Sequence, residues 1–203
     1  MMTIIKDKEP IYETEKYDVV LVGTSISCSL SSGFQGKIAH KYPYVDAEND
    51  KQPYRDNRRL GKRLTLAKEN YPIISLCYIC KYNNCKIETT DYEALETCLS
   101  TANAEFKGKR VLTTIMGGTK VDGNGNKEKC LQIIEDNTKD LIIDVYDYEQ
   151  ISATEERRRI CGKLFDYHKQ NNIRLTKKVL REEREKLFKE NFVNAIKYNG
   201  TIY

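Results

Sequence analysis

Short apolar runs rich in β-branched residues alternate with amphipathic stretches along the first 150 residues. A run such as 17–22 is apolar at nearly every position, which is typical of a strand buried on both faces. The segments that predict strands are 3–5, 17–22, 60–66, 73–79, 110–115 and 141–146. Apolar residues at helical spacing predict helices over 37–42, 91–106 and 127–137. This alternation predicts an α/β fold, with a mixed sheet covered by helices on both faces in three layers.

The segments between these elements are polar or contain turn-forming residues. Pro43 is expected to end the helix over 37–42. Residues 46–59 are crowded with charge and predict a surface excursion. Residues 81–90 predict a loop.

The last quarter of the chain has a different pattern, which predicts two helices. The first runs from about residue 154 to 170, and the second from 176 to about 198. We therefore expect a body of residues 1–150 and a C-terminal helical extension of residues 151–203. The extension holds 13 Lys and Arg against 7 Asp and Glu, whereas residues 1–150 hold 21 against 23. Such a basic tail is either a solvated helical face or a surface for a nucleic-acid or protein partner.

The cysteines and the overall hydropathy limit the class of protein. There are seven cysteines, with neither a secretory signal nor an apolar run of the ~20 residues that span a bilayer. We therefore expect free thiols in a cytoplasmic, reducing environment and no membrane partner. The spacing of Cys77 and Cys80 is that of some zinc ligands, but both lie within a predicted strand. They are better explained as core residues, and neither a metal nor a cofactor is predicted.

A glycine-rich segment carries the main chemical signal. Residues 116–125, called the glycine loop below, follow the strand over 110–115 and precede the helix over 127–137. Glycines in such a place let backbone N–H groups approach a phosphate, although many segments of this kind are plain turns. A loop of small and hydroxyl residues, 23–36, similarly follows the strand over 17–22 and is called the first loop. Because both loops follow strand ends, they can converge on one nucleotide.

Several short motifs occur in an order that resembles the macro domain. They are Asp18 to Val22, Ser25 to Cys28, Ser32-Gly33-Phe34, Leu60-Gly61, Tyr92 with Leu95, Met116 to Thr119, and Ile142 to Tyr146. The first loop looks most like the branch that holds the ADP-ribose 1″-phosphate phosphatases and the terminal ADP-ribose protein glycohydrolase. The resemblance covers roughly residues 3–147 and does not extend to the tail.

The resemblance implies a site for an ADP-ribose-type nucleotide. Carried over by position, Asp7 would bind the adenine amine, and Lys81 would be the nucleophile at the anomeric carbon. Asp122 would then act as general acid or base. The remaining ligand-binding positions are Ser25, near the place of the family's Asn, Gly33 and Phe34 beside the diphosphate and distal ribose, and Gly117, Gly118 and Thr119 around the diphosphate.

Departures from the family pattern leave the activity open. Ser31-Ser32-Gly33 stands where the family has Gly-Ala-Gly, and the Asn of many hydrolases is not evident. Reaching Asp122 requires a one-residue insertion. From sequence the protein is either a hydrolase of an ADP-ribosyl or ADP-ribose 1″-phosphate group, a non-catalytic binder of such a nucleotide or of an ADP-ribosylated partner, or an assembly protein with a degenerate site. On the last view Lys81 is a surface lysine, Asp122 and Asp7 are turn acids, and Phe34 is a core residue.

Overall fold

The computed structural model describes residues 1–6, 8–27, 30, 33–82, 88–119, 123–147 and 186. The chain divides into two compact units, Met1–Gln150 and Ile151–Tyr203. The two helices predicted for the tail lie outside the described residues, apart from Lys186.

A seven-stranded sheet forms the middle of this unit. Its strands are β1 Met2–Lys6, β2 Val19–Ser25, β3 Arg63–Leu66, β4 Ile73–Tyr82, β5 Glu88–Thr90, β6 Arg110–Thr114 and β7 Ile142–Asp147. The order across the sheet is β1-β7-β6-β2-β4-β3, and β5 pairs with β4. Neighbours from β1 to β4 are parallel, whereas β3 and β5 run antiparallel to β4. The predicted mixed sheet is confirmed.

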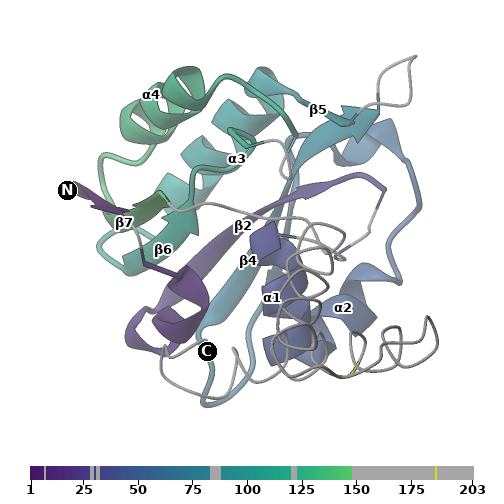
Figure 1. The fold of residues 1–203 in the computed structure, drawn as a ribbon, viewed down its shortest axis with the longest axis horizontal. Coiled ribbons are helices and arrows are strands. Elements are labelled where there is room, and N and C mark those ends of the chain that lie inside the picture. The colour runs from purple at the N-terminus through teal and green to yellow at the C-terminus, as the bar shows by residue number, and fades with distance from the viewer. Residues whose placement is uncertain are drawn as a thin grey trace, which may run out of the picture. The chain divides into compact units, whose positions relative to one another are not determined.

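Helices cover both faces of the sheet, as the alternating pattern predicted. They are α1 Gly33–Lys41, α2 Pro43–Asn49, α3 Tyr92–Glu105 and α4 Lys127–Asn137. Figure 1 shows α1 beside α2 on one side of the strands, and α3 with α4 on the other. The main apolar cluster joins the inner sides of α3 and α4 to alternate residues of β2, β4, β6 and β7. The three-layer prediction is thus confirmed.

The continuous apolar run of β2 has the explanation expected from sequence. All seven residues of the strand are buried. Val19 and Leu21 belong to the cluster under α3 and α4. Val20 and Val22 alternate with them and are equally buried, so they face the opposite helical layer. The strand is therefore central in the sheet and covered on both sides.

The expected surface excursion over 46–59 is wrong in part. As predicted, α1 ends before Pro43, at Lys41, but Pro43 is also the first residue of α2. Proline suits that position because its missing N–H has no helical acceptor there and its φ is already helical. Val45 and Asn49 are the buried residues of α2. Pro43 therefore separates two helices and does not begin a long exposed loop.

The predicted loop over 81–90 is also wrong in part. β4 continues to Tyr82, and the chain returns as β5, where Lys81 pairs with Thr89 and Cys80 with Thr90. A three-residue strand is too short to show an alternating pattern. The hairpin extends the sheet at the end where the parallel strands finish.

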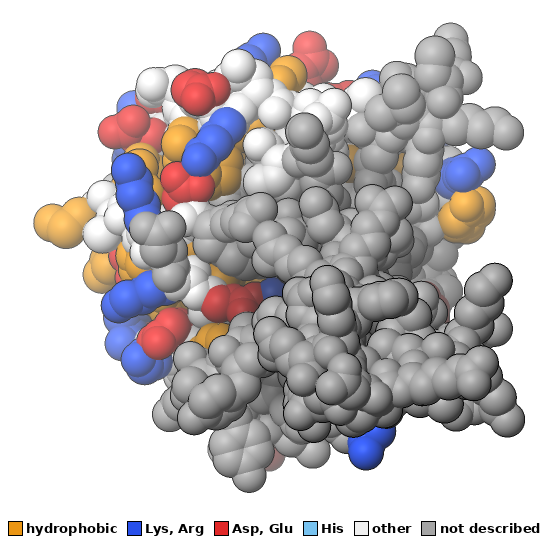
Figure 2. All heavy atoms as spheres, viewed as in Figure 1, with side chains coloured by type: hydrophobic (Ala, Val, Ile, Leu, Met, Phe, Trp, Pro, Cys, Tyr) orange, Lys and Arg blue, Asp and Glu red, His pale blue; other side chains and the backbone are white. Residues whose placement is uncertain are grey.

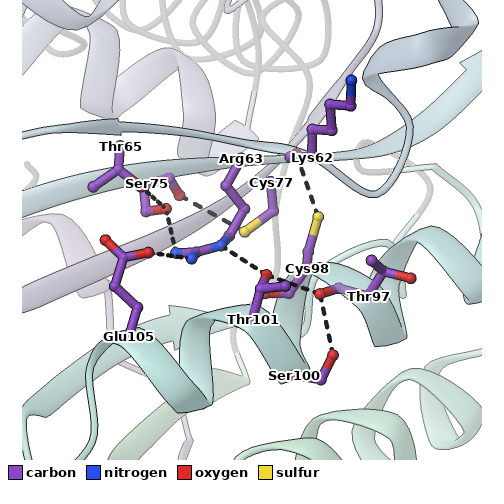
Figure 3. Close-up of polar contacts among 10 residues, drawn as sticks. All are labelled: Lys62, Arg63, Thr65, Ser75, Cys77, Thr97, Cys98, Ser100, Thr101 and Glu105. Carbon is purple, nitrogen blue, oxygen red and sulfur yellow. Dashed lines mark hydrogen bonds and ion pairs between the residues drawn. The ribbon is translucent and has the colours of Figure 1, made fainter.

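The arginine at position 63, Arg63, joins β3, at the edge of the sheet, to α3 (Figure 3). Its Nε donates to Thr101 at 3.1 Å, and its Nη1 donates to Ser75 at 3.1 Å. The other Nη forms an ion pair with Glu105. The side chain of Arg63 is only 8% exposed. Each of the three guanidinium nitrogens therefore has an oxygen partner.

The cysteines that the structure describes are core residues, as predicted. Cys77, Cys80, Cys98 and Cys130 are buried free thiols, while the other three cysteines lie outside the described residues. The hydrogen bond with Cys77, together with burial, raises the pKa of the Cys98 thiol. Both effects keep that thiol protonated and unreactive.

The surface of the described part carries charges of both signs. Figure 2 shows acidic and basic side chains interspersed on the face around α3 and α4. This mixture agrees with the near balance of charge in residues 1–150. Among the described residues, no helix is long and apolar enough to cross a membrane.

Candidate functional site

The two loops singled out from sequence follow neighbouring strands. β2 and β6 are adjacent and parallel, so their carboxyl ends lie at the same edge of the sheet. The end of β2 also lies against the start of the glycine loop, since a Cβ added to Gly23 would lie 3.1 Å from the Cβ of Met116. The topology therefore brings the first loop and the glycine loop together, at the edge where α/β sheets bind ligands.

The first loop leaves β2 through a compact turn. Ser25 is buried, and its Oγ accepts a hydrogen bond from the N–H of Ser27 at 3.2 Å. The N–H of Ile26 donates to the carbonyl of Cys80 at 3.0 Å, which ties the turn to β4. The Ser25 hydroxyl thus shapes the turn at the place where the family resemblance puts an Asn.

The predicted residues Gly33 and Phe34 open α1. Gly33 has a φ of +58°, a conformation that L side chains adopt rarely. Phe34 is 3% exposed and counts among the core residues. A glycine in this conformation turns the chain sharply into the helix. α1 therefore begins at Gly33, inside the segment predicted as the first loop and four residues before the predicted helix start.

The glycine loop is closed by its own backbone. Gly117 has a φ of +74°, and its carbonyl accepts a hydrogen bond from the N–H of Gly125 at 2.7 Å. Asn124 N–H donates to the Thr119 carbonyl at 2.7 Å. Gly118 N–H donates to the Ile115 carbonyl at 3.1 Å. These bonds fix the described residues at the two ends of the loop.

The end of the glycine loop is fixed to the start of both nearby helices. The Asn126 side chain caps α4 by accepting from Lys129 N–H at 2.7 Å. Asn126 N–H donates to the hydroxyl of Tyr92, the first residue of α3, at 2.9 Å. The Lys129 ammonium lies 3.9 Å from the centre of the Tyr92 ring. The Tyr that the family resemblance placed at this helix start therefore holds the loop and α4 in register with α3.

Three buried polar atoms at this edge have no hydrogen-bond partner among the described residues. They are Thr24 Oγ1 at the end of β2, Gln35 Oε1 in the first turn of α1, and Thr119 Oγ1 in the glycine loop. Leaving a buried polar atom unpaired costs about 1–3 kcal/mol. Atoms of this kind indicate positions at which a polar ligand gains hydrogen bonds.

Lys81 has a partner that the sequence did not reveal. Its Nζ lies 2.5 Å from Oδ2 of Asp91, while Oδ1 of Asp91 accepts from the N–H of Ala94 at 3.1 Å and caps α3. Burial raises the pKa of Asp91, but the hydrogen bonds from Lys81 and Ala94 outweigh burial and bring the pKa below its usual value. The carboxylate therefore stays ionised and holds the Lys81 ammonium.

The structure gathers some of the predicted site residues and does not describe others. Ser25 pairs with Cys80, directly before Lys81, so the two predicted residues lie at the same edge. Asp7 and Asp122 lie outside the described residues, so the assignments of the adenine acid and the general acid or base remain predictions. Sequence reasoning missed Thr24 and Gln35, because a buried unpaired oxygen leaves no mark in the pattern of residue types.

No metal centre emerges within the described ranges, where no three His, Cys, Asp or Glu side chains gather in a ligand-like group. The polar groups at this edge are backbone amides, hydroxyls, one side-chain amide and the Lys81–Asp91 ion pair. Groups of this chemistry suit the phosphates and hydroxyls of a nucleotide better than a metal ion.

The comparisons with known proteins rest on structure. Neither a protein-family model nor a curated protein matches the sequence. The macrodomain of Thermus aquaticus DarG has a TM-score of 0.54 at 11% identity, covering 73% of this chain and 99% of its own. Thermosipho africanus DarTG in complex with ADP-ribose has a TM-score of 0.57 at 9% identity, covering 73% of this chain and 41% of its own.

A third solved structure agrees with these two. The macrodomain of Mycobacterium tuberculosis DarG has a TM-score of 0.56 at 12% identity, covering 72% of this chain and 98% of its own. The TM-scores establish the architecture. At identities this low, the branch suggested by the first loop stays a prediction. Together with the strand order and the loops at the ends of β2 and β6, the TM-scores show that residues 1–150 have the macrodomain fold.

Proposed function

We propose that this protein binds ADP-ribose or a close derivative at the carboxyl ends of β2 and β6. The observation that carries the proposal is the meeting of the two loops at neighbouring strand ends, beside the unpaired oxygens of Thr24, Gln35 and Thr119. The glycine loop and the first turn of α1 supply backbone amides in the setting where phosphates bind. That Thermosipho africanus DarTG was solved in complex with ADP-ribose, on a similar fold, supports the choice of ligand.

We assign the ligand groups by chemistry. The diphosphate lies between the first turn of α1 and the glycine loop, because the glycines at 33, 36, 117 and 118 allow a close approach to the backbone. The three unpaired oxygens take hydroxyl or phosphate partners. Asp7 remains the proposed acid for the adenine amine.

A more specific proposal is that the protein hydrolyses an ADP-ribosyl or ADP-ribose 1″-phosphate group. In that form the Lys81 amine attacks the anomeric carbon of the distal ribose, and the bond from that carbon to the departing carboxylate or phosphate oxygen breaks. Asp122 gives a proton to the departing oxygen, and water then releases the ADP-ribose from the lysine. The attack needs a neutral amine, since an ammonium has no free electron pair. Lys81 must therefore leave Asp91 and lose a proton before it can act.

A binding-only function is the second candidate, and the Lys81–Asp91 ion pair favours it. The Nζ of Lys81 is engaged with the Asp91 carboxylate at 2.5 Å. An ammonium at the strand ends can still attract an anionic nucleotide. On this view the protein sequesters or senses the nucleotide, or docks an ADP-ribosylated partner, without turnover.

Calorimetric titration of the full chain with ADP-ribose tests the proposal. We expect saturable binding, and absence of binding at millimolar ligand would contradict it. Turnover of an ADP-ribosylated peptide and of ADP-ribose 1″-phosphate then separates the two candidates. If turnover occurs, the Lys81→Ala and Asp122→Ala variants should lose it and still bind ADP-ribose. Binding without turnover selects the second candidate.

A further inference from the structure

On the basis of the function proposed above, we propose that Thr90 is the positioning residue that sets the shape of the glycine loop for its ligand. Thr90 is the last residue of β5 and the residue before the cap of α3. No sequence motif pointed to it. Its contacts with the loop nevertheless involve both limbs.

Two hydrogen bonds join Thr90 to opposite limbs of the loop. Its Oγ1 donates to the carbonyl of Gly117 at 2.7 Å. Its backbone N–H donates to the carbonyl of Gly123 at 3.0 Å. Gly117 lies on the limb that leaves β6, and Gly123 lies on the limb that returns to α4. One residue of β5 therefore holds the two limbs at a fixed separation.

The glycines of the loop lie directly against this side chain. A Cβ added to Gly117 would come within 2.6 Å of the Thr90 Cγ2, and one added to Gly123 within 2.3 Å of its Oγ1. A Cβ added to Gly125 would lie 3.1 Å from the Thr90 Cβ. Real Cβ atoms do not approach as closely as the first two distances. Glycine is therefore required at positions 117 and 123 because a larger residue would collide with Thr90. This requirement does not depend on which ligand the loop binds.

The glycine loop is preorganised. The Gly117 carbonyl accepts from both Thr90 Oγ1 and Gly125 N–H, each at 2.7 Å. Thr119, two residues after Gly117, keeps an unpaired Oγ1 among the described residues. A loop whose shape is fixed before binding loses less conformational entropy when the ligand arrives. Thr90 thus contributes to affinity without a contact to the nucleotide.

The chain offers a matched control at the neighbouring position. Thr89 lies on the same strand, and its Oγ1 donates to the carbonyl of Lys81 at 3.3 Å, away from the glycine loop. Thr90→Val removes the hydroxyl and keeps the branched shape, Thr90→Ser keeps the hydroxyl, and Thr89→Val removes the control hydroxyl.

The experiment measures ADP-ribose affinity by calorimetry, and amide hydrogen exchange over residues 116–125 in the ligand-free full chain. We expect about tenfold weaker binding for Thr90→Val, the loss that one hydrogen bond represents. Exchange in the loop should also accelerate for this variant. Thr90→Ser should restore both readouts, and Thr89→Val should match the wild type.

Two results would overturn the inference. One is a Thr90→Val protein that keeps wild-type exchange in the loop. The other is faster exchange throughout the sheet, because that would make Thr90 a general stability residue. If the wild type does not bind ADP-ribose, the proposed function fails, and loop exchange alone decides the role of Thr90. Faster amide exchange in Thr90→Val, confined to residues 116–125 and reversed in Thr90→Ser, supports the role.

Discussion

At the scale of single residues, the candidate site depends on how closely backbone and side chains approach each other. Gly117 and Gly108 have the same φ of +74° and different surroundings. A Cβ at Gly117 would meet Thr90 at 2.6 Å, whereas one at Gly108 would meet nothing within 4 Å. Substitutions at these two glycines therefore distinguish the effect of backbone strain from the effect of side-chain crowding.

We expect Gly117→Ala to lose ADP-ribose affinity and Gly108→Ala to retain it. Both variants put an L residue in the left-handed region, at a cost of about 1 kcal/mol of stability. Only Gly117→Ala also displaces Thr90 and the loop. Chemical denaturation and calorimetric titration of the two proteins check this, and equal affinities would contradict the assignment of the glycine loop.

The ion pair between Lys81 and Asp91 predicts a pH dependence of stability. The folded pKa of Asp91 is lowered, so its stabilisation is fully present above the unfolded pKa of about 4. It is lost as pH falls through the folded pKa. Asp91→Asn keeps an acceptor for Ala94 and removes the charge. Because Lys81 is 45% exposed and therefore screened, the variant should lose only about 0.5 kcal/mol at pH 7.

Denaturation curves from pH 7 down to pH 3 measure this difference. We expect the wild type and Asp91→Asn to converge at the acidic end. Lys81→Met completes a double-mutant cycle, which isolates the pair from the cap. A cycle with no coupling energy at pH 7 would show that the two side chains do not interact in solution.

At the scale of elements, β3 is paired with β4, and a polar cluster around Arg63 also ties it to α3. Arg63 is buried, and Glu105 on α3 supplies its only charged partner among the described contacts. We expect Glu105→Gln to lower the free energy of unfolding by about 1 kcal/mol, because a charge-assisted bond becomes a neutral one. Glu96→Gln, an exposed position on the same helix, should have no effect. Urea denaturation of both variants checks the prediction, and equal stabilities would contradict it.

The sequence predicted long elements well and short ones poorly. The helix over 127–137 has the expected bounds because Asn126 caps it and a turn of small residues precedes it. β5 was missed because three residues carry no period, and α2 because Pro43 was interpreted only as a stop. The partner of Lys81 was missed because it lies across a hairpin whose pairing depends on β5. Contacts of that kind follow from register, which the order of residue types does not specify.

At the scale of the whole molecule, the main apolar cluster lies entirely within the first compact unit. A chain that ends at Gln150 should therefore unfold cooperatively and bind ADP-ribose within about twofold of the full chain. Calorimetry and thermal denaturation of the two proteins side by side measure this. A shortened chain that fails to fold, or binds much more weakly, would assign the basic extension a part in the site. The protein or nucleic-acid partner that the charge of the extension suggests stays a prediction.

The pairing of β1 with β7 has a consequence for synthesis on the ribosome. Met2 pairs with Ile143, and β2 pairs with β6 across some ninety residues, from Val19 to Val111. The emerging polypeptide therefore cannot complete its sheet until nearly the whole unit has left the exit tunnel. Contacts so distant along the chain form slowly. The proposed ligand site needs β6 and α4, which are also synthesised late, so a translation product that ends before them has no ligand to stabilise it.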